Sequence, residues 1–202
     1  MKKYLLIAML LMTFGAVQTH AQLGLKLGYN FAKISGIDVV PGYSEKSLNN
    51  IQGGVFYEKG LIPLLGLRIG LDYSPKGSKE VKGSDYDQTT FNYLELPLLA
   101  KVKLGPMYAL GGFYGAYALN GKSKFSLAGQ TQNSDFDFDK SKVKRFDYGM
   151  KFGAGLQFGV GPIHIFAQAD YSFGLQNISK TSGQNYKNNV IGVAAGVLLG
   201  FK

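Results

Sequence analysis

Residues 146–160 read Phe-Asp-Tyr-Gly-Met-Lys-Phe-Gly-Ala-Gly-Leu-Gln-Phe-Gly-Val, and this stretch decides the class of fold. Every second residue from Phe146 to Val160 is apolar, and the residues between them are glycine or polar. Successive side chains of a β-strand point to opposite faces, so this alternation predicts a strand with one apolar face. A helix would instead repeat its apolar positions every three to four residues.

The same alternation recurs along the chain. We expect eight strands, near residues 23–31, 50–59, 65–74, 89–104, 106–120, 146–160, 163–173 and 191–201. Long connections near 35–49, 77–88, 121–145 and 176–187 alternate with short ones at 59–63, 105–106 and 161–162. Membrane barrels have short periplasmic turns and long external loops in this order. The prediction for residues 22–202 is therefore an all-β, eight-stranded antiparallel up-and-down transmembrane β-barrel.

A soluble barrel also has one apolar face, and three features favour the membrane type. Strands of ten or more residues suit a tilted crossing of the bilayer. Glycine on the polar face suits the crowded interior of an eight-stranded barrel. Aromatic residues gather at the long-loop ends of the strands, where a membrane-interface girdle belongs: Tyr29, Phe31, Tyr73, Phe146, Tyr148, Tyr171 and Phe173, with Phe158 and Phe201 for the other interface.

The first residues have the pattern of a secretory signal peptide. Lys2 and Lys3 precede an apolar run from Tyr4 to Val17, and the small residues Thr19 and Ala21 follow it. The run is too short for a helix across a hydrocarbon core of about 30 Å. We therefore predict a signal peptide over 1–21, cleaved between Ala21 and Gln22, and export to the outer membrane.

Composition restricts the possible partners. The chain has no cysteine, which excludes disulfides and thiol chemistry. Its net charge of +9 falls by two on removal of Lys2 and Lys3, so the exported protein stays basic. A basic exported protein can meet anionic headgroups of outer-membrane lipid, whereas we expect no nucleic-acid partner outside the cytoplasm.

Two segments leave the strand pattern incomplete. Pro97 lies inside the expected strand 89–104, where it cannot donate to the ladder, so we expect a β-bulge nearby. Such a bulge would also explain why Phe91 and Tyr93 lie on the parity opposite to the apolar face. In 106–120, Phe113 and Tyr114 have opposite parity, so neither face is assigned.

Charged residues of both signs fall on the parity of the lumen, and the expectation is a paired network that fills the barrel. An ion pathway is the alternative, but an eight-stranded barrel leaves no open channel once side chains fill it. The residues concerned are Glu58, Arg68, Asp72, Glu95, Lys101, Lys103, Asp147, Lys151 and Asp170.

His164 is the one candidate for catalysis, as part of a lipid-modifying enzyme with Asp170 and Ser172 from the same face. Along one strand, His164 and Ser172 are about 26 Å apart, so this alternative needs partners from other strands. We therefore expect a non-enzymatic barrel with a structural, scaffolding or surface-interaction role and no cofactor.

The longest connection contains two polar patterns. Asp135, Asp137 and Asp139 resemble the start of an EF-hand loop, but Lys140 and Phe146 stand where glycine and glutamate are needed, so we expect no metal site. We expect instead a hairpin that extends beyond the membrane, with alternating faces. The basic residues that follow could bind anionic phosphates of surface glycolipid, or could simply be solvated: Lys140, Lys142, Lys144 and Arg145.

Three stretches resemble the PorT-like outer-membrane β-barrel proteins common in Bacteroidetes. They are Asn92–Gly105 (NYLELPLLAKVKLG), Phe146–Gly159 and Asp170–Ile178, and the segment around Pro97 is the most specific. The resemblance implies an outer-membrane barrel of about eight strands. Some members of that family are linked to protein secretion, so secretion-complex proteins are possible partners. The family brings no catalytic or binding residues to this chain.

Overall fold

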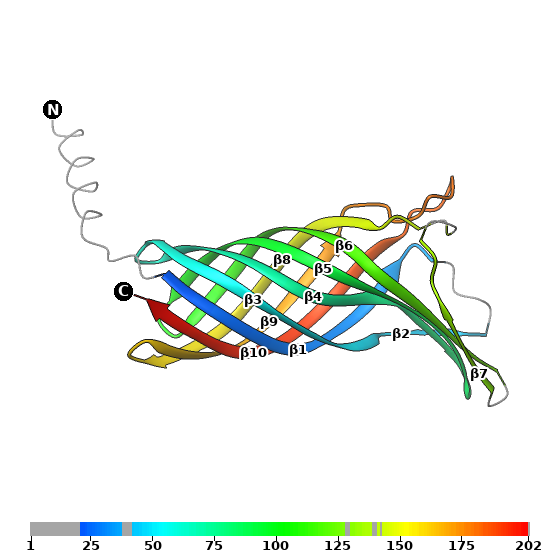
Figure 1. Ribbon diagram of the computed structural model, residues 1–202, viewed down its shortest axis with the longest axis horizontal. Helices are drawn as coiled ribbons and strands as arrows, with labels where there is room; N and C mark the ends of the chain where they lie inside the picture. The colour runs from blue at the N-terminus through cyan, green and yellow to red at the C-terminus, as the bar shows by residue number, and fades with distance from the viewer. Residues whose placement is uncertain (1–20, 38–41, 128–129, 139–140, 142, 202) are drawn as a thin grey trace.

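The computed structural model describes residues 21–37, 42–127, 130–138, 141 and 143–201. Ten antiparallel strands form one sheet (Figure 1). The strands are β1 (Ala21–Ser35), β2 (Ser44–Lys46), β3 (Leu48–Ile62), β4 (Leu65–Lys82), β5 (Asp85–Leu104), β6 (Met107–Leu127), β7 (Gln130–Asp135), β8 (Phe146–Val160), β9 (Ile163–Gly174) and β10 (Lys187–Phe201). Within the described residues, no helix is long and apolar enough to cross a membrane.

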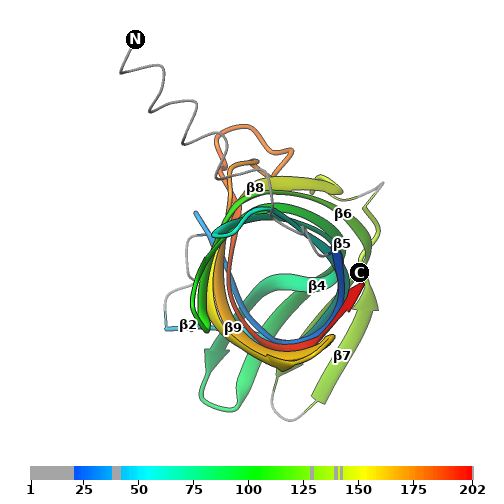
Figure 2. The ribbon, with the colours of Figure 1, turned by 90° about the vertical axis from the view of Figure 1, so that its left-hand side faces the viewer.

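Eight of these strands close into a barrel, as the sequence predicts (Figure 2). Each pairs with the next along the chain, except that β1 pairs with β3 and β6 pairs with β8. β1 also closes the ring against β10, from Ala21–Phe201 to Ser35–Lys187. Closure removes the sheet edges whose unpaired N–H and C=O groups a bilayer cannot solvate.

Glycine opens the short turns for a conformational reason. Gly83, Gly105 and Gly161 have positive φ angles of 60°, 64° and 61°, and a Cβ atom at these positions would meet nothing within 4 Å. The left-handed backbone, not lack of space, therefore requires glycine there.

Two connections predicted as loops are largely strand. Residues 77–88 form a hairpin, because β4 runs to Lys82 and β5 starts at Asp85, and the connection 121–145 contains the end of β6 and all of β7. The loop prediction was wrong for 77–88, because these strands carry polar side chains on both faces and show no apolar periodicity. In 121–145, the pairing of β6 with β7 confirms the hairpin expected beyond the membrane. Both connections contribute to a sheet beyond the barrel, here called the distal sheet: β2, residues 77–82 of β4, 85–90 of β5, 121–127 of β6, and β7 (Figure 1).

The explanation offered for Phe91 and Tyr93 was also wrong. Both side chains are buried inside the barrel, on the same parity as Glu95, so β5 alternates without a break. The register shift lies between Asn92 and Tyr93 and places an extra residue in β6, and the ladder between β4 and β5 has a gap opposite Pro97. The barrel thus tolerates this proline through two missing ladder pairs, opposite Leu96 and Pro97, with the bulge four to five residues away.

The outward face of the barrel is apolar. Its exposed side chains include Leu27 at 66%, Phe113 at 60% and Ile165 at 60%, and they extend around the ring on all eight strands. The aromatic residues predicted for the girdle at the long-loop end also point outward, with Tyr29, Tyr73, Phe146, Tyr148 and Tyr171 exposed and Phe31 and Phe173 partly exposed. Phe158 is exposed near the other end, and the side chain of Phe201 lies outside the described residues.

Candidate functional site: the lumen and the distal sheet

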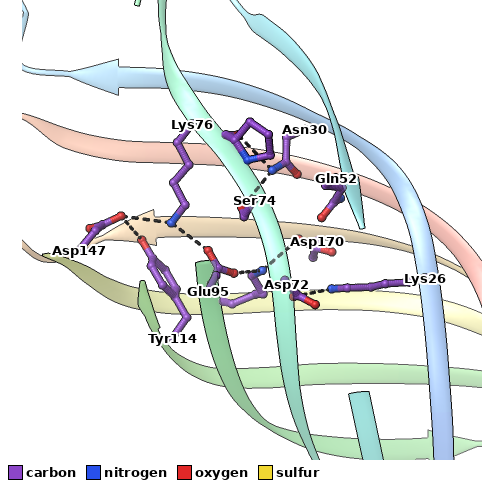
Figure 3. Close-up of polar contacts among 12 residues, drawn as sticks. Lys26, Asn30, Gln52, Asp72, Ser74, Lys76, Glu95, Tyr114, Asp147 and Asp170 are labelled. Atoms are coloured by element: carbon purple, nitrogen blue, oxygen red, sulfur yellow. Dashed lines mark hydrogen bonds and ion pairs between the residues drawn. The ribbon is translucent and has the colours of Figure 1, made fainter. Parts of the chain in front are cut away.

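The lumen contains a network of buried ion pairs, centred on Glu95 (Figure 3). The Lys76 ammonium lies 2.9 Å from Glu95 and 3.1 Å from Asp147, and Lys151 also pairs with Glu95. Asp147 accepts further hydrogen bonds from Asn188 at 3.0 Å and from the Tyr114 hydroxyl at 3.3 Å. Burial strengthens such bonds and makes an unpaired charge costly, so each cation here needs its acid.

A second group of ion pairs lies nearer the short-turn end of the barrel. Glu58 accepts a hydrogen bond from Arg68 Nε at 2.6 Å and from the Lys101 ammonium at 2.8 Å. The Arg68 guanidinium also donates to Gln168 at 2.7 Å, and Gln168 donates to Asp170 at 3.1 Å. Gln168 therefore connects the two groups of ion pairs into one network.

This lumen network is balanced in charge. Lys26 pairs with Asp72 at 2.7 Å, and Lys151 lies 4.0 Å from Asp170. Within the described part of the barrel, the network joins five cations to five carboxylates: Lys26, Arg68, Lys76, Lys101 and Lys151 with Glu58, Asp72, Glu95, Asp147 and Asp170. The sequence-based prediction of a paired network is confirmed by these contacts.

Three details of that prediction change. Lys103 is only partly buried, at the short-turn rim, and is not a member of the network. Lys26 and Lys76 belong to the network but were not predicted. Lys26 follows the lumen parity of its strand and could have been found by that signal, whereas Lys76 lies beyond the last apolar residue of the β4 pattern.

Apolar clusters lie at both ends of the network. At the short-turn end, Arg68 stacks 4.1 Å above the Phe56 ring, within a cluster of Phe56, Leu99, Tyr108, Leu110, Phe166 and Leu198. At the other end, Phe91 and Tyr93 pack with Phe138 and Ile178, which come from the connections after β7 and β9. The lumen is thus filled in three layers, apolar, charged and apolar.

His164 lies apart from the residues needed for a catalytic triad. It lines an open depression of about 370 Å³ at the short-turn rim, together with Lys103, Tyr108 and Gln157, and no serine or aspartate lines this depression. Asp170 and Ser172 are buried deep in the lumen, where Asp170 serves the network. The structure therefore does not bring the predicted His, Asp and Ser together.

Comparison with known proteins agrees with this architecture. The sequence profile of one family, described as outer membrane protein beta-barrel domain, matches residues 16–180. The chain belongs to this family. It is an outer-membrane protein, and the apolar outward face of the barrel is its lipid-facing surface.

Solved structures of other outer-membrane proteins resemble this outer-membrane barrel in fold alone. The solid-state NMR structure of outer membrane protein AlkL in DMPC bilayers is 10% identical, with 93% of each chain covered and a TM-score of 0.50. Neisserial surface protein A is 15% identical (90% and 97% covered, TM-score 0.47), and OprG from Pseudomonas aeruginosa is 12% identical (91% and 97% covered, TM-score 0.47). No curated protein matches the sequence.

The polar patterns of the connection 121–145 have a structural reason in this outer-membrane barrel. Asp135 and Asp137 alternate with Phe136 and Phe138 because the two phenyl rings pack on Phe91, at centroid distances of 4.9 and 5.5 Å. No group of three or more His, Asp or Glu residues that could hold a metal occurs in the described parts of the chain. Asp139, Lys140 and Lys142 lie outside the described residues.

The two described residues of the basic run 140–145 are held close to the barrel mouth. The Arg145 guanidinium lies 4.9 Å from the Phe138 ring, and Lys144 donates its backbone N–H to the Ile178 carbonyl at 2.7 Å. The segment is therefore anchored to the connection after β9, and Arg145 is partly occupied by an internal contact.

Proposed function

We propose that this outer-membrane barrel is non-enzymatic and acts in a structural, scaffolding or surface-interaction role, with the distal sheet as its contact surface. The observation that carries the proposal is the lumen network. Its charged groups partner one another and are enclosed by apolar clusters, so they serve the stability of the barrel.

The distal sheet, in contrast to the enclosed lumen, exposes its side chains to solvent. All six residues of β7 are exposed, and β7 pairs with a neighbour on one side only. By the usual orientation of such barrels, with short turns in the periplasm, this sheet stands on the cell surface. A rigid sheet with exposed polar faces and open edges is suited to contact other molecules.

Conductance in planar bilayers tests the role of the lumen. A filled eight-stranded barrel is expected to give no large, stable unitary step. Such a step in the wild type would contradict the proposal and would favour an ion pathway.

Photo-crosslinking on intact cells tests the contact surface. A photoreactive residue at Thr131 of β7 is expected to capture surface partners, whereas the same residue at the lipid-facing Leu25 serves as the matched control. Equal adducts from both positions would show that the distal sheet has no preferred partner.

The resemblance to PorT-like proteins supports a finer version of this proposal, in which the partners belong to a protein-secretion complex. Deletion of the gene should then leave secreted proteins inside the cell, and a crosslink from Thr131 should contain the same partner in stoichiometric amount. Normal secretion by the deletion strain would reject this version and leave the barrel's scaffolding role intact.

Export through a cleaved signal peptide over 1–21 is also part of the proposal, and 1–20 lie outside the described residues. β1 begins at Ala21, so cleavage before Gln22 would leave the barrel strands complete apart from one residue. Mass spectrometry of the intact protein should give an N-terminus at Gln22. The segment Lys140–Arg145 remains a proposed contact for glycolipid phosphates.

The absence of enzymatic activity is tested with labelled outer-membrane lipids. The purified wild type is expected to leave them intact. Hydrolysis that is lost in His164→Ala would contradict the proposal and would support the lipid-modifying alternative.

A further inference from the structure

The strand register of the distal sheet aligns lysines from three strands on one face. Lys46 of β2 lies opposite Lys79 of β4, Lys79 lies opposite Gln88 of β5, and Gln88 lies opposite Lys124 of β6, which in turn lies opposite Asn133 of β7. Directly opposed residues of antiparallel strands have their side chains on the same face. Lys46, Lys79 and Lys124, here called the lysine row, therefore share one face of the sheet.

A further lysine and a hollow adjoin the lysine row. Lys122 lies opposite Thr90 of β5 and Asp135 of β7, one row nearer the barrel and on the same face. An open hollow of about 400 Å³ is lined by Lys122, Lys124, Asn133, Ser134 and Asp135. The hollow combines two ammonium groups and side-chain hydrogen-bond donors with one carboxylate, that of Asp135, so its lining has a net positive charge that suits an oxyanion such as phosphate.

The face of the lysine row carries more positive charge than its acids balance: in the described distal sheet, Lys46, Lys79, Lys122 and Lys124 share this face with one acid, Asp135, which lies opposite Lys122. Lys46 and Lys79 are directly opposite each other, and like charges in that arrangement are destabilising. None of the ion pairs among the described residues includes a member of the row. Glu45, Glu80 and Asp87 lie opposite one another on the other face, as a second row.

The lysine row is on the face that continues the lipid-facing wall. On β5, every second side chain lies on the same face, so Gln88 shares the outward face of the exposed Leu94. Gln88 lies opposite Lys79, so the lysine row is on this outward face. On β6, Lys124 is five residues beyond the lipid-facing Leu119, or about 16 Å along the strand at ~3.3 Å per residue. A strand tilt of about 35–45° reduces this distance to roughly 12 Å along the membrane normal. A headgroup layer is only about 5–7 Å deep on each side, so the row lies just above the lipid phosphates, within reach of long lysine side chains.

The sheet also extends sideways from the barrel. Figure 2 shows the hairpin of β4 and β5, and β7, outside the circle of the barrel wall. The space beside this part of the wall is occupied by lipids of the outer leaflet. A face with net positive charge at this position is complementary in charge to anionic headgroups.

We propose that the lysine row, with Lys122, binds the phosphate groups of anionic glycolipid in the outer leaflet beside the barrel. The inference deepens the proposed function by naming a lipid partner for the distal sheet, and it rests on that sheet standing outside the membrane. Lipid binding by the lysine row does not depend on whether the lumen is closed. A negative lipid-binding result and a positive conductance result would therefore reject different parts of the proposal.

The test compares glycolipid binding by the full-length mature protein and two triple variants. The first is Lys46→Gln/Lys79→Gln/Lys124→Gln. The matched control, Lys59→Gln/Lys82→Gln/Lys187→Gln, removes the same charge elsewhere, and Lys82 is on the opposite face of the same hairpin. Native mass spectrometry measures the binding of a diphosphorylated glycolipid, and gel mobility of unboiled samples confirms that each variant is folded.

At about 1 kcal/mol for each lysine near an anionic surface, loss of the row should weaken binding roughly 100-fold, and the control should weaken it less than fivefold. A Lys→Arg triple variant should bind as the wild type does, and salt should weaken wild-type binding. Equal loss in both triple variants would overturn the proposal. So would equal wild-type binding of the dephosphorylated glycolipid, or competition by millimolar inorganic phosphate that removes all binding.

Discussion

Replacement of Glu95 by glutamine should destabilise the barrel more than any substitution on its surface. Glu95 is completely buried and forms ion pairs with two buried lysines, Lys76 at 2.9 Å and Lys151. Glutamine has nearly the same shape, so the change removes the charge and leaves the packing in place. Two cations then share the lumen with one fewer anion.

The magnitude follows from the contacts that remain. Removal of one partner from a buried ion pair costs about 3–5 kcal/mol, because the other charge is left without compensation. Lys76 keeps Asp147 at 3.1 Å, but Lys151 keeps only Asp170, at 4.0 Å. We therefore expect the free energy of unfolding to fall by about 3 kcal/mol, the lower end of that range.

Urea unfolding in phosphatidylcholine vesicles, followed by the gel mobility of unboiled samples, measures this change. Asp135→Asn is the control, because this exposed acid at the end of β7 should change stability by less than about 0.5 kcal/mol. The double variant Glu95→Gln/Lys151→Gln should lose less than the sum of its single variants, since the uncompensated cation is removed with its acid. A cost for Glu95→Gln no larger than that of the control would refute the reasoning and would indicate a lumen wet enough to solvate the lysines.

Three other substitutions test different parts of the structure. Gly28→Ala should cost about 1–3 kcal/mol in the same unfolding assay, because its Cβ would lie 1.9 Å from the Val193 carbonyl oxygen, whereas Gly60→Ala enters open space and should stay near zero. Leu27→Arg, at a side chain 66% exposed to lipid, should cost about 2–4 kcal/mol, and no loss would argue against a membrane-facing wall. Phe138→Ala should loosen the apolar cluster of Phe91, Tyr93, Phe138 and Ile178 at the barrel mouth, and trypsin should then cleave faster within 140–145. An unchanged cleavage rate would show that this cluster does not hold the connection.

The barrel was predictable from sequence because a membrane-spanning strand has two different faces. Within 146–160, lipid selects large apolar side chains on one face, and the crowded lumen selects glycine and paired charges on the other. The resulting period of two identified all eight barrel strands and most of the lumen network. The apolar pattern of the lipid face and the glycine and charge pattern of the lumen face can both be read from one strand, without knowing which strands are neighbours.

The distal sheet could not be found in the same way. Beyond the membrane both faces of a strand meet water, so Lys79, Gln88 and Lys124 carry no alternation of polarity that would indicate a strand. Their common face depends on the pairing of β4, β5 and β6, and pairing is not encoded in the spacing of any one segment. Phe91 and Tyr93 were misread for a related reason, because apolar side chains at the mouth point into the lumen and pack on Phe138.

The distribution of charge finally connects the closed lumen to the proposed surface role. The chain has 22 basic and 13 acidic residues, and the lumen network contains five of each, so the excess of positive charge lies outside the lumen. Among the described residues outside the lumen network, ten basic and six acidic residues belong to segments at the long-loop end of the barrel, which the proposed orientation places on the cell surface. An anion channel would need that excess inside its pore, whereas a protein that binds anionic lipid needs it beside the leaflet. The excess is where lipid binding requires it, and the distal sheet concentrates it further, because four of its lysines share one face with a single described acid, Asp135.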